Sequence, residues 1–433
     1  MEQTNQPAMA DPRRWRDVAL ALLFLLLQAG SVAAELPNPL HVGDLPRLAR
    51  EGRSEVKAAQ ARALAANQRP AIVSALEDPM VAPAVDHYPY EMMEEEDGSG
   101  RRYSWSVAVE QRFPLSGIRG HRQRSAQAMA ARLEAETDRT VLDVELDAVT
   151  AFLMLHERRR MVEVVAKQME LAHQFVTATG TRYAASSGNQ ADVLRAEVEV
   201  ARLDAAQRAL TSEVRAAEAM FNASLGRAIN ASVPALTTPA NESLPPPWEA
   251  VRAQALQRRP ELRAGEAEIE QTKAEVDVMR AMYLPMGMIR GGQASTMAEG
   301  AGAMLMVGIS IPIWRERLRS GVSEAKAMQD MARADLGAMQ LMIEGEAAAA
   351  RDQVDAARVR YLAFRDEVVP RAQRAVTPAL TNYAAGQGSL TAVIEAAQSL
   401  WSAQADLVMN ETNLGLAWAR LHRATGDLEQ EAR

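Results

Sequence analysis

The chain of 433 residues contains no cysteine. That absence excludes disulfide bonds, thiolate metal sites, a cysteine nucleophile and a lipid-anchored N-terminal cysteine. Aromatic residues make up only 4% of the chain, and glycine occupies only 24 positions. This composition, rich in alanine, glutamate, arginine and glutamine, favours long helices in contact with one another over a thick globular core. The net charge of -8 argues against nucleic acid as a partner.

Long apolar runs are missing beyond the N-terminus. Residues 1–34 combine three arginines, an apolar run over 18–27 and small residues at 32–34, which is the pattern of a secretory signal peptide. An uncleaved N-terminal anchor is the alternative interpretation. Elsewhere no segment reaches the ~20 uninterrupted apolar residues of a spanning helix, so a membrane role would fall to β-strands or to the surface.

Motifs for catalysis are also missing. The six histidines show no spacing typical of a metal site, and no phosphate-binding glycine loop or nucleophile elbow is present. We therefore predict that the protein is not an enzyme and needs no cofactor.

The sequence matches itself. Residues 55–79 align without a gap with residues 261–285 at an offset of 206, and Gly188 and Gly226 align with Gly388 and Gly426 at an offset of 200. Self-similarity at a near-constant offset indicates a tandem repeat. The predicted organisation is a signal peptide at 1–34, a first repeat at 35–233, a proline-rich linker at 234–248 and a second repeat at 249–433.

Each repeat has one stretch with the two-residue period of a strand. In "RYSWSVAVEQRF" the side chains Tyr103, Trp105, Val107 and Val109 fall on one face, with small and polar residues on the other. The counterpart in the second repeat places Leu305, Val307, Ile309 and Ile311 on the apolar face. We predict one β-hairpin in each repeat, at about 79–114 and about 285–312.

The remainder of each repeat is helical in pattern. Residues 120–182 would form a rod of about 95 Å, and residues 315–382 a second one that Pro370 must kink. A turn follows each rod, at about 184–190 and about 384–390, and leads into shorter return helices at 191–225 and 391–425. Helices over 45–76 and 248–283 would stack end to end with these return helices and supply the missing length.

At this point the sequence resembles an outer membrane factor of the TolC family, the outer membrane efflux proteins. The resemblance covers essentially all of the mature chain and is carried by "VVPRAQRAVTPALTNYAAGQGSLTAVIEAAQSLWSAQADLV" and "EQRFPLSGIRGHRQRSAQA". It implies an α+β membrane protein and a homotrimer. Its twelve-stranded β-barrel, with four strands from each chain, would be continuous with a long periplasmic α-helical coiled-coil barrel.

The resemblance also implies a location and partners. The protein would lie in the cell outer membrane, in contact with outer membrane lipid, with a large periplasmic portion. It would be the exit duct of a tripartite pump, together with a periplasmic adaptor (membrane fusion protein) and an inner-membrane pump such as an RND transporter. A periplasmic coiled-coil scaffold or adaptor without a pore is the alternative from another class.

Residue roles follow from the resemblance around the two turns. An aromatic before the second turn and an aspartate after the first, here Tyr383 and Asp192, would form part of a closed-state latch. The family's acidic gate residue after the second turn is replaced by Ala392, and the next acidic residue is Glu395. Three copies of Glu395 would favour cations.

The adaptor would dock at the turn glycines Gly188, Gly386 and Gly388, where reversing a helix needs a residue that tolerates positive φ. Relatives that carry an arginine at the position of Gly388 have a second latch contact there, so a weaker lock is expected here.

Methionine is the one clue to the substrate. The chain has 22 methionines. Strand parity places Met286 and Met288 on the same face as Arg290, and it places Met304 and Met306 on the face that does not carry Leu305. If that face lines the lumen, thioethers would suit Cu(I) or Ag(I), as in the heavy-metal efflux branch. Methionine as space filler, in a duct for drugs or other small molecules, is the alternative.

Overall fold

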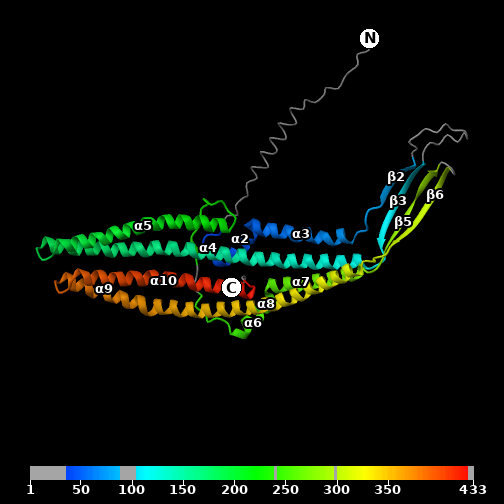
Figure 1. Cartoon of the computed structure of the whole chain (residues 1–433). Coiled ribbons are helices and arrows are strands. Elements are labelled where there is room, and N and C mark those ends of the chain that lie inside the picture. The colour runs from blue at the N-terminus through cyan, green and yellow to red at the C-terminus, as the bar shows by residue number, and fades with distance from the viewer. Residues whose placement is uncertain (1–35, 88–103, 238–240, 297–299, 428–433) are drawn as a thin grey trace, which may run out of the picture.

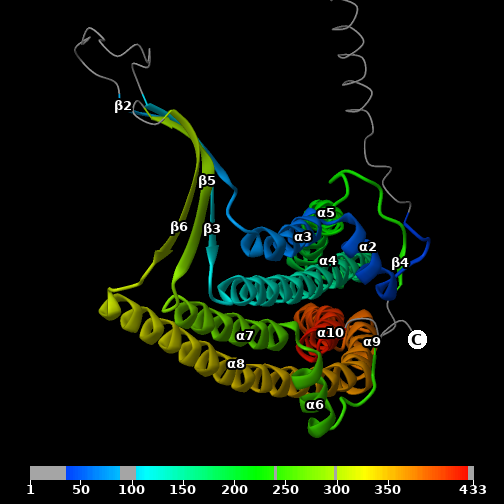
Figure 2. The same ribbon diagram turned by 90° about the vertical axis from the view of Figure 1, so that its right-hand side faces the viewer.

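The computed structural model describes residues 36–87, 104–237, 241–296 and 300–427. Long helices lie side by side, and strands leave one end of this helical layer as a curved ribbon (Figure 1, Figure 2). The predicted signal peptide and Tyr103 lie outside the described residues.

The two halves show the same order of helices. Those of the first half are α2 (Leu45–Gly52), α3 (Ser54–Ser74), α4 (Ile118–Ala184) and α5 (Gln190–Ser224). Those of the second half are α6 (Trp248–Arg258), α7 (Pro260–Ala281), α8 (Arg315–Ala363), the π-helical turn η2 (Phe364–Val368), α9 (Val369–Ala384) and α10 (Leu390–Thr425).

In the described residues the helices form four rods. The α3 and α5 helices lie in one line, and α7 and α10 in another, while α4 packs between these two lines (Figure 1). The α8 and α9 helices pack on the far side of α7 and α10. This arrangement gives α4, with 67 residues, a neighbour along most of its length on both sides.

The first helix of each half is broken, where the sequence predicts one continuous helix. Arg53 separates α2 from α3, and Arg259 separates α6 from α7; both are extended, with ψ of 128° and 120°. Pro260 explains the second break, because a residue before proline is disfavoured in the α region. The short helices α2 and α6 therefore lie beside the rods and do not continue them.

Glycine allows the end-to-end contact of α5 with α3. Gly226 follows α5 with a φ of +67°, and a Cβ built there would lie 2.4 Å from the carbonyl oxygen of Gly52. A Cβ on Gly52 would in turn lie 2.0 Å from the carbonyl oxygen of Leu225. The backbones touch at this junction, so neither position has room for a side chain.

The predicted disturbance at Pro370 takes the form of a π-helical turn. The η2 turn ends two residues before this proline, and α9 begins beside it. Proline lacks the N–H that would bond the carbonyl one turn earlier, and the wider π turn absorbs the loss without ending the rod.

The long strands form a single antiparallel sheet. Their order is β2 (Met80–His87), β3 (Ser104–Pro114), β5 (Met286–Thr296) and β6 (Gly300–Ser310), so the hairpins of the two halves meet at β3 and β5. A separate parallel pair, β1 (Leu40–His41) with β4 (Leu236–Thr237), ties the start of the described chain to the linker.

We predict that Gly226→Ala lowers the free energy of unfolding by ~2 kcal/mol or more, since alanine is strained at positive φ and its Cβ would strike the Gly52 backbone. Gly180→Ala, within α4 and with nothing within 4 Å of its built Cβ, is the matched control and should be neutral or stabilising. Thermal unfolding in detergent measures both. Equal midpoints would mean that the junction is not closely packed.

Candidate functional site

The turns at the far end of the rods are two copies of one structure. After α4, Ser186 has a φ of 56°, and its N–H donates to the Tyr183 carbonyl at 2.9 Å. After α9, Gly386 has a φ of +81°, and its N–H donates to the Tyr383 carbonyl at 3.0 Å. With the bonds from Ser187 and Gln387 back to residues 182 and 382, both turns are Schellman motifs.

The role expected of the turn glycines needs correction. Positive φ falls on Ser186 and Gly386, whereas Gly188 and Gly388 do not have it. Gly188 is instead required by a close approach, because a Cβ built there would lie 2.9 Å from the Tyr183 nitrogen. At Gly388 the same contact is 3.4 Å, which is ordinary packing.

Tyr383 and Asp192 meet beneath the turns. The Tyr383 hydroxyl donates to Asp192 Oδ2 at 3.3 Å, and the side chain is 1% exposed. Its counterpart Tyr183 is 50% exposed. The chain therefore uses the two matching tyrosines differently.

Arg182, which sequence reasoning missed, holds the two turns together. Its Nη1 donates to the Tyr383 carbonyl at 2.6 Å, and its Nη2 to the Ser187 carbonyl at 2.9 Å. The guanidinium also lies 4.6 Å from the Tyr383 ring centroid, a cation–π contact. Asn382 stands at the matching position, so comparing the two halves could have singled out this arginine as the difference.

Burial, and after it the negative charge of Asp192, raise the pKa of Tyr383, while Arg182 partly opposes the shift. The phenol therefore stays protonated and able to donate to Asp192 at neutral pH.

Glu395 lies apart from this cluster. It is exposed on the second turn of α10 and lines a groove shared with the start of α5. Among the residues that the structure describes, no hydrogen bond or ion pair joins Glu395 to Tyr383 or Asp192.

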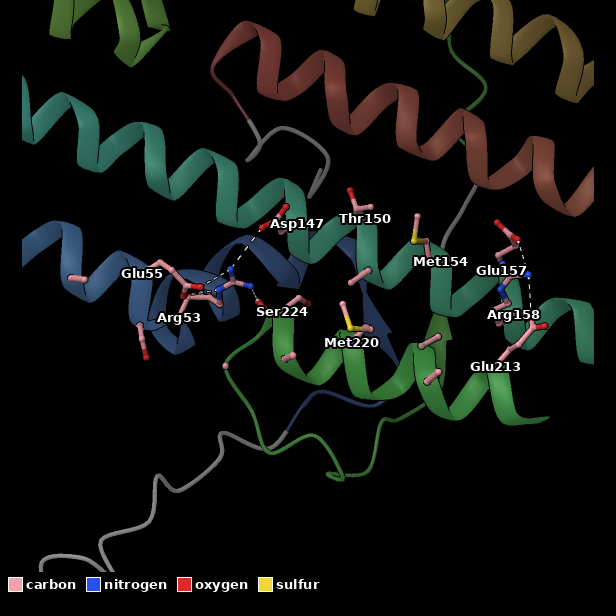
Figure 3. Close-up of a pocket in the computed structure, with 17 residues that line it drawn as sticks. Arg53, Glu55, Asp147, Thr150, Met154, Glu157, Arg158, Glu213, Met220 and Ser224 are labelled. Carbon is pink, nitrogen blue, oxygen red and sulfur yellow. Dashed lines mark hydrogen bonds and ion pairs between the residues drawn. The ribbon is translucent and has the colours of Figure 1, made fainter. Parts of the chain in front are cut away.

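A larger groove of about 1340 Å³ lies where α5 meets α3 against α4 (Figure 3). Met154 and Met220 form its apolar middle, and charged side chains stand at both ends. At one end Arg53 contacts Glu55 at 3.0 Å and Asp147 at 3.7 Å, and it donates to the Ser224 carbonyl at 3.3 Å. Arg53 thus clamps the end of α5 to the start of α3.

The second half repeats this clamp with deeper burial. Arg259 contacts Glu261 at 2.9 Å and Glu346 at 3.0 Å, and it donates to the Ala424 carbonyl at 3.4 Å. Arg423 adds a contact to Glu261 at 2.8 Å. The Arg-x-Glu spacing occurs at 53 and 259, in line with the 206-residue offset, and is the sequence signal that could have identified the clamp.

Burial on its own would raise the pKa of Glu261, but the bond from Arg259 and the charge of Arg423 outweigh it and lower the pKa below 4.5. The buried carboxylate is therefore ionised and paired, which is the condition under which a buried charge is tolerated.

The sheet has two unlike faces. The register places Met288 opposite Arg112, and Arg290 opposite Glu110 on one side and Met306 on the other. Met80, Met286 and Met304 share this face by the same register. The four predicted methionines and Arg290 thus lie on one face, which we call the methionine face. Arg112 donates to Glu110 Oε1 at 2.9 Å on it.

The opposite face, which we call the apolar face, is made of large exposed side chains. Leu305 is 76% exposed, and the residues Val81, Val85, Val107, Val109, Ile289, Val307 and Ile309 are exposed with it. This alternation was predicted from the sequence of β3 and β6.

Among the described residues, no group of three or more histidine, aspartate or glutamate side chains could hold a metal ion. None of the described helices is both long and apolar enough to cross a bilayer.

Acid should weaken the buried clamp. Because the pKa of Glu261 is lower in the folded than in the unfolded chain, its contribution to stability is complete above about pH 4.5 and is lost as the pH falls below that. We predict that Glu261→Gln lowers the thermal midpoint at pH 7, and that this difference from wild type shrinks between pH 4.5 and pH 3.

The control is Glu270→Gln on the same helix, where an exposed carboxylate contacts Lys273 at 3.1 Å. An exposed pair contributes little, so this variant should follow wild type at every pH. A Glu261→Gln deficit that stayed constant down to pH 3 would contradict the role given to the charge.

Comparison with known proteins gives one family. The family model described as "Outer membrane efflux protein" matches residues 251–427. The outer membrane efflux protein BepC of Brucella suis is 26% identical over 289 residues, which is 64% of this chain and 62% of BepC. The chain therefore covers less than two thirds of the length of that relative.

The cobalt-zinc-cadmium resistance protein CzcC of Cupriavidus metallidurans is also similar, with 23% identity over 290 residues, covering 65% of this chain and 68% of CzcC. In fold, the chain matches the solved structure of the channel CusC with a TM-score of 0.77 at 14% identity, covering 89% of this chain and 92% of CusC. The second half of the chain, residues 251–427, thus matches the outer membrane efflux protein family, and the chain has the fold of the solved channel CusC.

Proposed function

We propose that this chain is the outer membrane exit duct of a tripartite efflux system and not an enzyme. The observation that carries the proposal is one long rod layer joined directly to a sheet with an exposed apolar face. With 67 residues, α4 alone spans about 100 Å. A helical layer of that length with apolar strands at one end suits a tube that stands in the periplasm and ends in the outer membrane.

Both the sheet and the rod layer have open edges that a second copy would cover. Within the described residues β2 and β6 each pair along one edge only. Met220 on α5 and Leu341 on α8, at the two sides of the rod layer, are 69% and 73% exposed. Closed oligomers remove such edges. A homotrimer of this tandem repeat would give a twelve-stranded barrel above a twelve-rod tube.

The location and partners follow from this arrangement. Outer membrane lipid would cover the apolar face, and the rods would stand in the periplasm. The two turns, exposed at the end farthest from the sheet, would meet the periplasmic adaptor around Gly188, Gly386 and Gly388. An inner-membrane pump such as an RND transporter would supply the energy.

The direction of the two sheet faces can be tested on one strand. Leu305→Lys would place a charge in lipid and cost about 2–4 kcal/mol per chain. We expect this variant to lose the folded trimer from outer membrane fractions. Met304→Lys, the neighbouring residue on the methionine face, should keep it. The readout is the heat-sensitive trimer band on a gel run without boiling, and equal loss from both variants would contradict the assignment.

We propose that Tyr383 and Asp192 form a latch that holds the far end of the tube closed. Tyr383→Phe removes the hydroxyl that donates to Asp192, and Asp192→Ala removes the acceptor. Each should raise single-channel conductance in planar bilayers, because one constraint on the closed turns is lost.

Tyr183→Phe is the matched control, because this counterpart is half exposed and Asp192 accepts from Tyr383; the variant should leave conductance unchanged. If wild type conducts and neither latch variant conducts more, the latch proposal is wrong but the duct proposal stands. An osmotic-shock-soluble monomer without conductance would instead support the periplasmic scaffold without a pore.

For the substrate, two observations favour different classes. The methionine face, with Met286, Met288, Met304 and Met306, offers thioethers that suit Cu(I) or Ag(I), and the relative CzcC is named for cobalt, zinc and cadmium resistance. The described charges on that face are Glu110, Arg112 and Arg290, which sum to +1 per chain (2 − 1). That excess disfavours bare cations and supports drugs or other small molecules as the alternative.

A further inference from the structure

The first turns of α5 and α10 form a groove of about 510 Å³ near the ends of the rods. Its lining comes equally from the two helices: Leu194, Arg195, Val198 and Glu199 from α5, and Thr391, Ile394, Glu395 and Gln398 from α10. Arg195 lies five residues after Gln190, where α5 begins, and Glu395 lies five residues after Leu390, where α10 begins. The same step of the repeat thus carries opposite charges in the two halves.

The other charge in the groove is already engaged. Glu199 is buried, accepts from Gln398 Nε2 at 3.1 Å and contacts Arg202 at 3.6 Å. Asp192, seven residues before Glu199 on the same helix, accepts from the Tyr383 hydroxyl. Arg195 and Glu395 are both exposed, and within the described part of the chain neither has an ion-pair partner. They are the two groove charges available to a passing solute.

We propose that Arg195 is a selectivity-determining residue, which together with Glu395 forms a ring of alternating charge at the narrow end of the duct. This inference rests on the proposed trimeric channel. Three guanidinium groups and three carboxylates would stand at one level, because both residues have the same place relative to their helix starts. An acidic ring of Glu395 alone is not what this chain builds.

The physical consequence is weak discrimination between ions. Three carboxylates alone would attract cations into a narrow opening and repel anions. Three guanidinium groups at the same level bring the net charge of the ring to zero. Salt screens the remaining field of the separate charges over about 8 Å at physiological ionic strength. The ring then acts on a solute only at close range, through hydrogen bonds and ion pairs of either sign.

The test is the reversal potential of single channels in planar bilayers under a KCl gradient. We expect wild type to pass K⁺ and Cl⁻ with similar permeability. Arg195→Gln should leave the carboxylates unopposed and raise the ratio of K⁺ to Cl⁻ permeability by about three- to tenfold, and Glu395→Gln should lower it by a similar factor. The double variant should return close to wild type.

Arg208→Gln is the control, since Arg208 is an exposed arginine of α5 that contacts Asp204 and does not line the groove. It should keep the wild-type ratio. A wild-type channel that strongly prefers K⁺ to Cl⁻ would overturn the alternating ring. So would an Arg195→Gln variant with the same permeability ratio as wild type. Absence of any conductance in wild type and in every variant would instead mean that the proposed duct itself is wrong.

Discussion

The whole architecture depends on two places where the end of one helix meets the start of another. The return helix α5 has 35 residues, against 67 in α4, so it can cover only about half of its neighbour. The α3 helix covers the remainder only if it begins where α5 stops. Bare backbone at Gly52 and Gly226 permits that contact, and the Arg53 guanidinium holds it by donating to the Ser224 carbonyl at the end of α5.

The two junctions differ in what they connect. The first is a local clamp, with Glu55 and Asp147 largely exposed. The second draws α4 and α10 together as well, because Arg423 contacts both Glu261 and Asp143 of α4, each within 2.8 Å. Arg423 thus joins the two halves through Asp143, and the burial of its other partner, Glu261, makes the loss of either charge costly. Of the two clamps, only the one in the second half also joins α10 to α4.

The same divergence appears at the far end of the rods. Tyr183 and Tyr383 occupy equal positions, yet one is exposed and the other lies under Arg182 against Asp192. Two identical turns placed side by side cannot make identical contacts, since each faces a different neighbour. The copies differ at the residue before the tyrosine, which is Arg182 in the first half and Asn382 in the second. This difference decides which tyrosine is covered.

Periodicity was sufficient for the strands and long helices. The two-residue alternation of β3 and β6 identified their apolar faces, and the parity of Met286 and Met304 with Arg290 agrees with the observed register. Local backbone geometry was not predictable to the same degree. The break at Arg259 follows from Pro260, whereas no proline follows Arg53, which instead contacts Asp147 and the Ser224 carbonyl.

The turns show a similar limit. Glycine marked them correctly, but positive φ falls on Ser186 in the first turn, since the Schellman bonds fix the position and serine tolerates it. Reading Glu395 alone suggested an acidic gate, and only the shared groove revealed Arg195 as its counterpart. The surroundings of Glu395 depend on how α5 and α10 lie side by side, which the sequence of α10 alone does not show.

Charge along the duct bears on what the methionines can do. The described charges of the methionine face sum to +1 per chain, from Glu110, Arg112 and Arg290, and the groove near the turns is lined by both Arg195 and Glu395. These described residues give neither surface an excess of negative charge that would concentrate cations. Thioethers are neutral ligands, so a soft metal ion would have to be captured by coordination, against a small repulsion. Under the proposed function, a solute delivered by a pump needs no such attraction, and substrate choice would then rest with the pump.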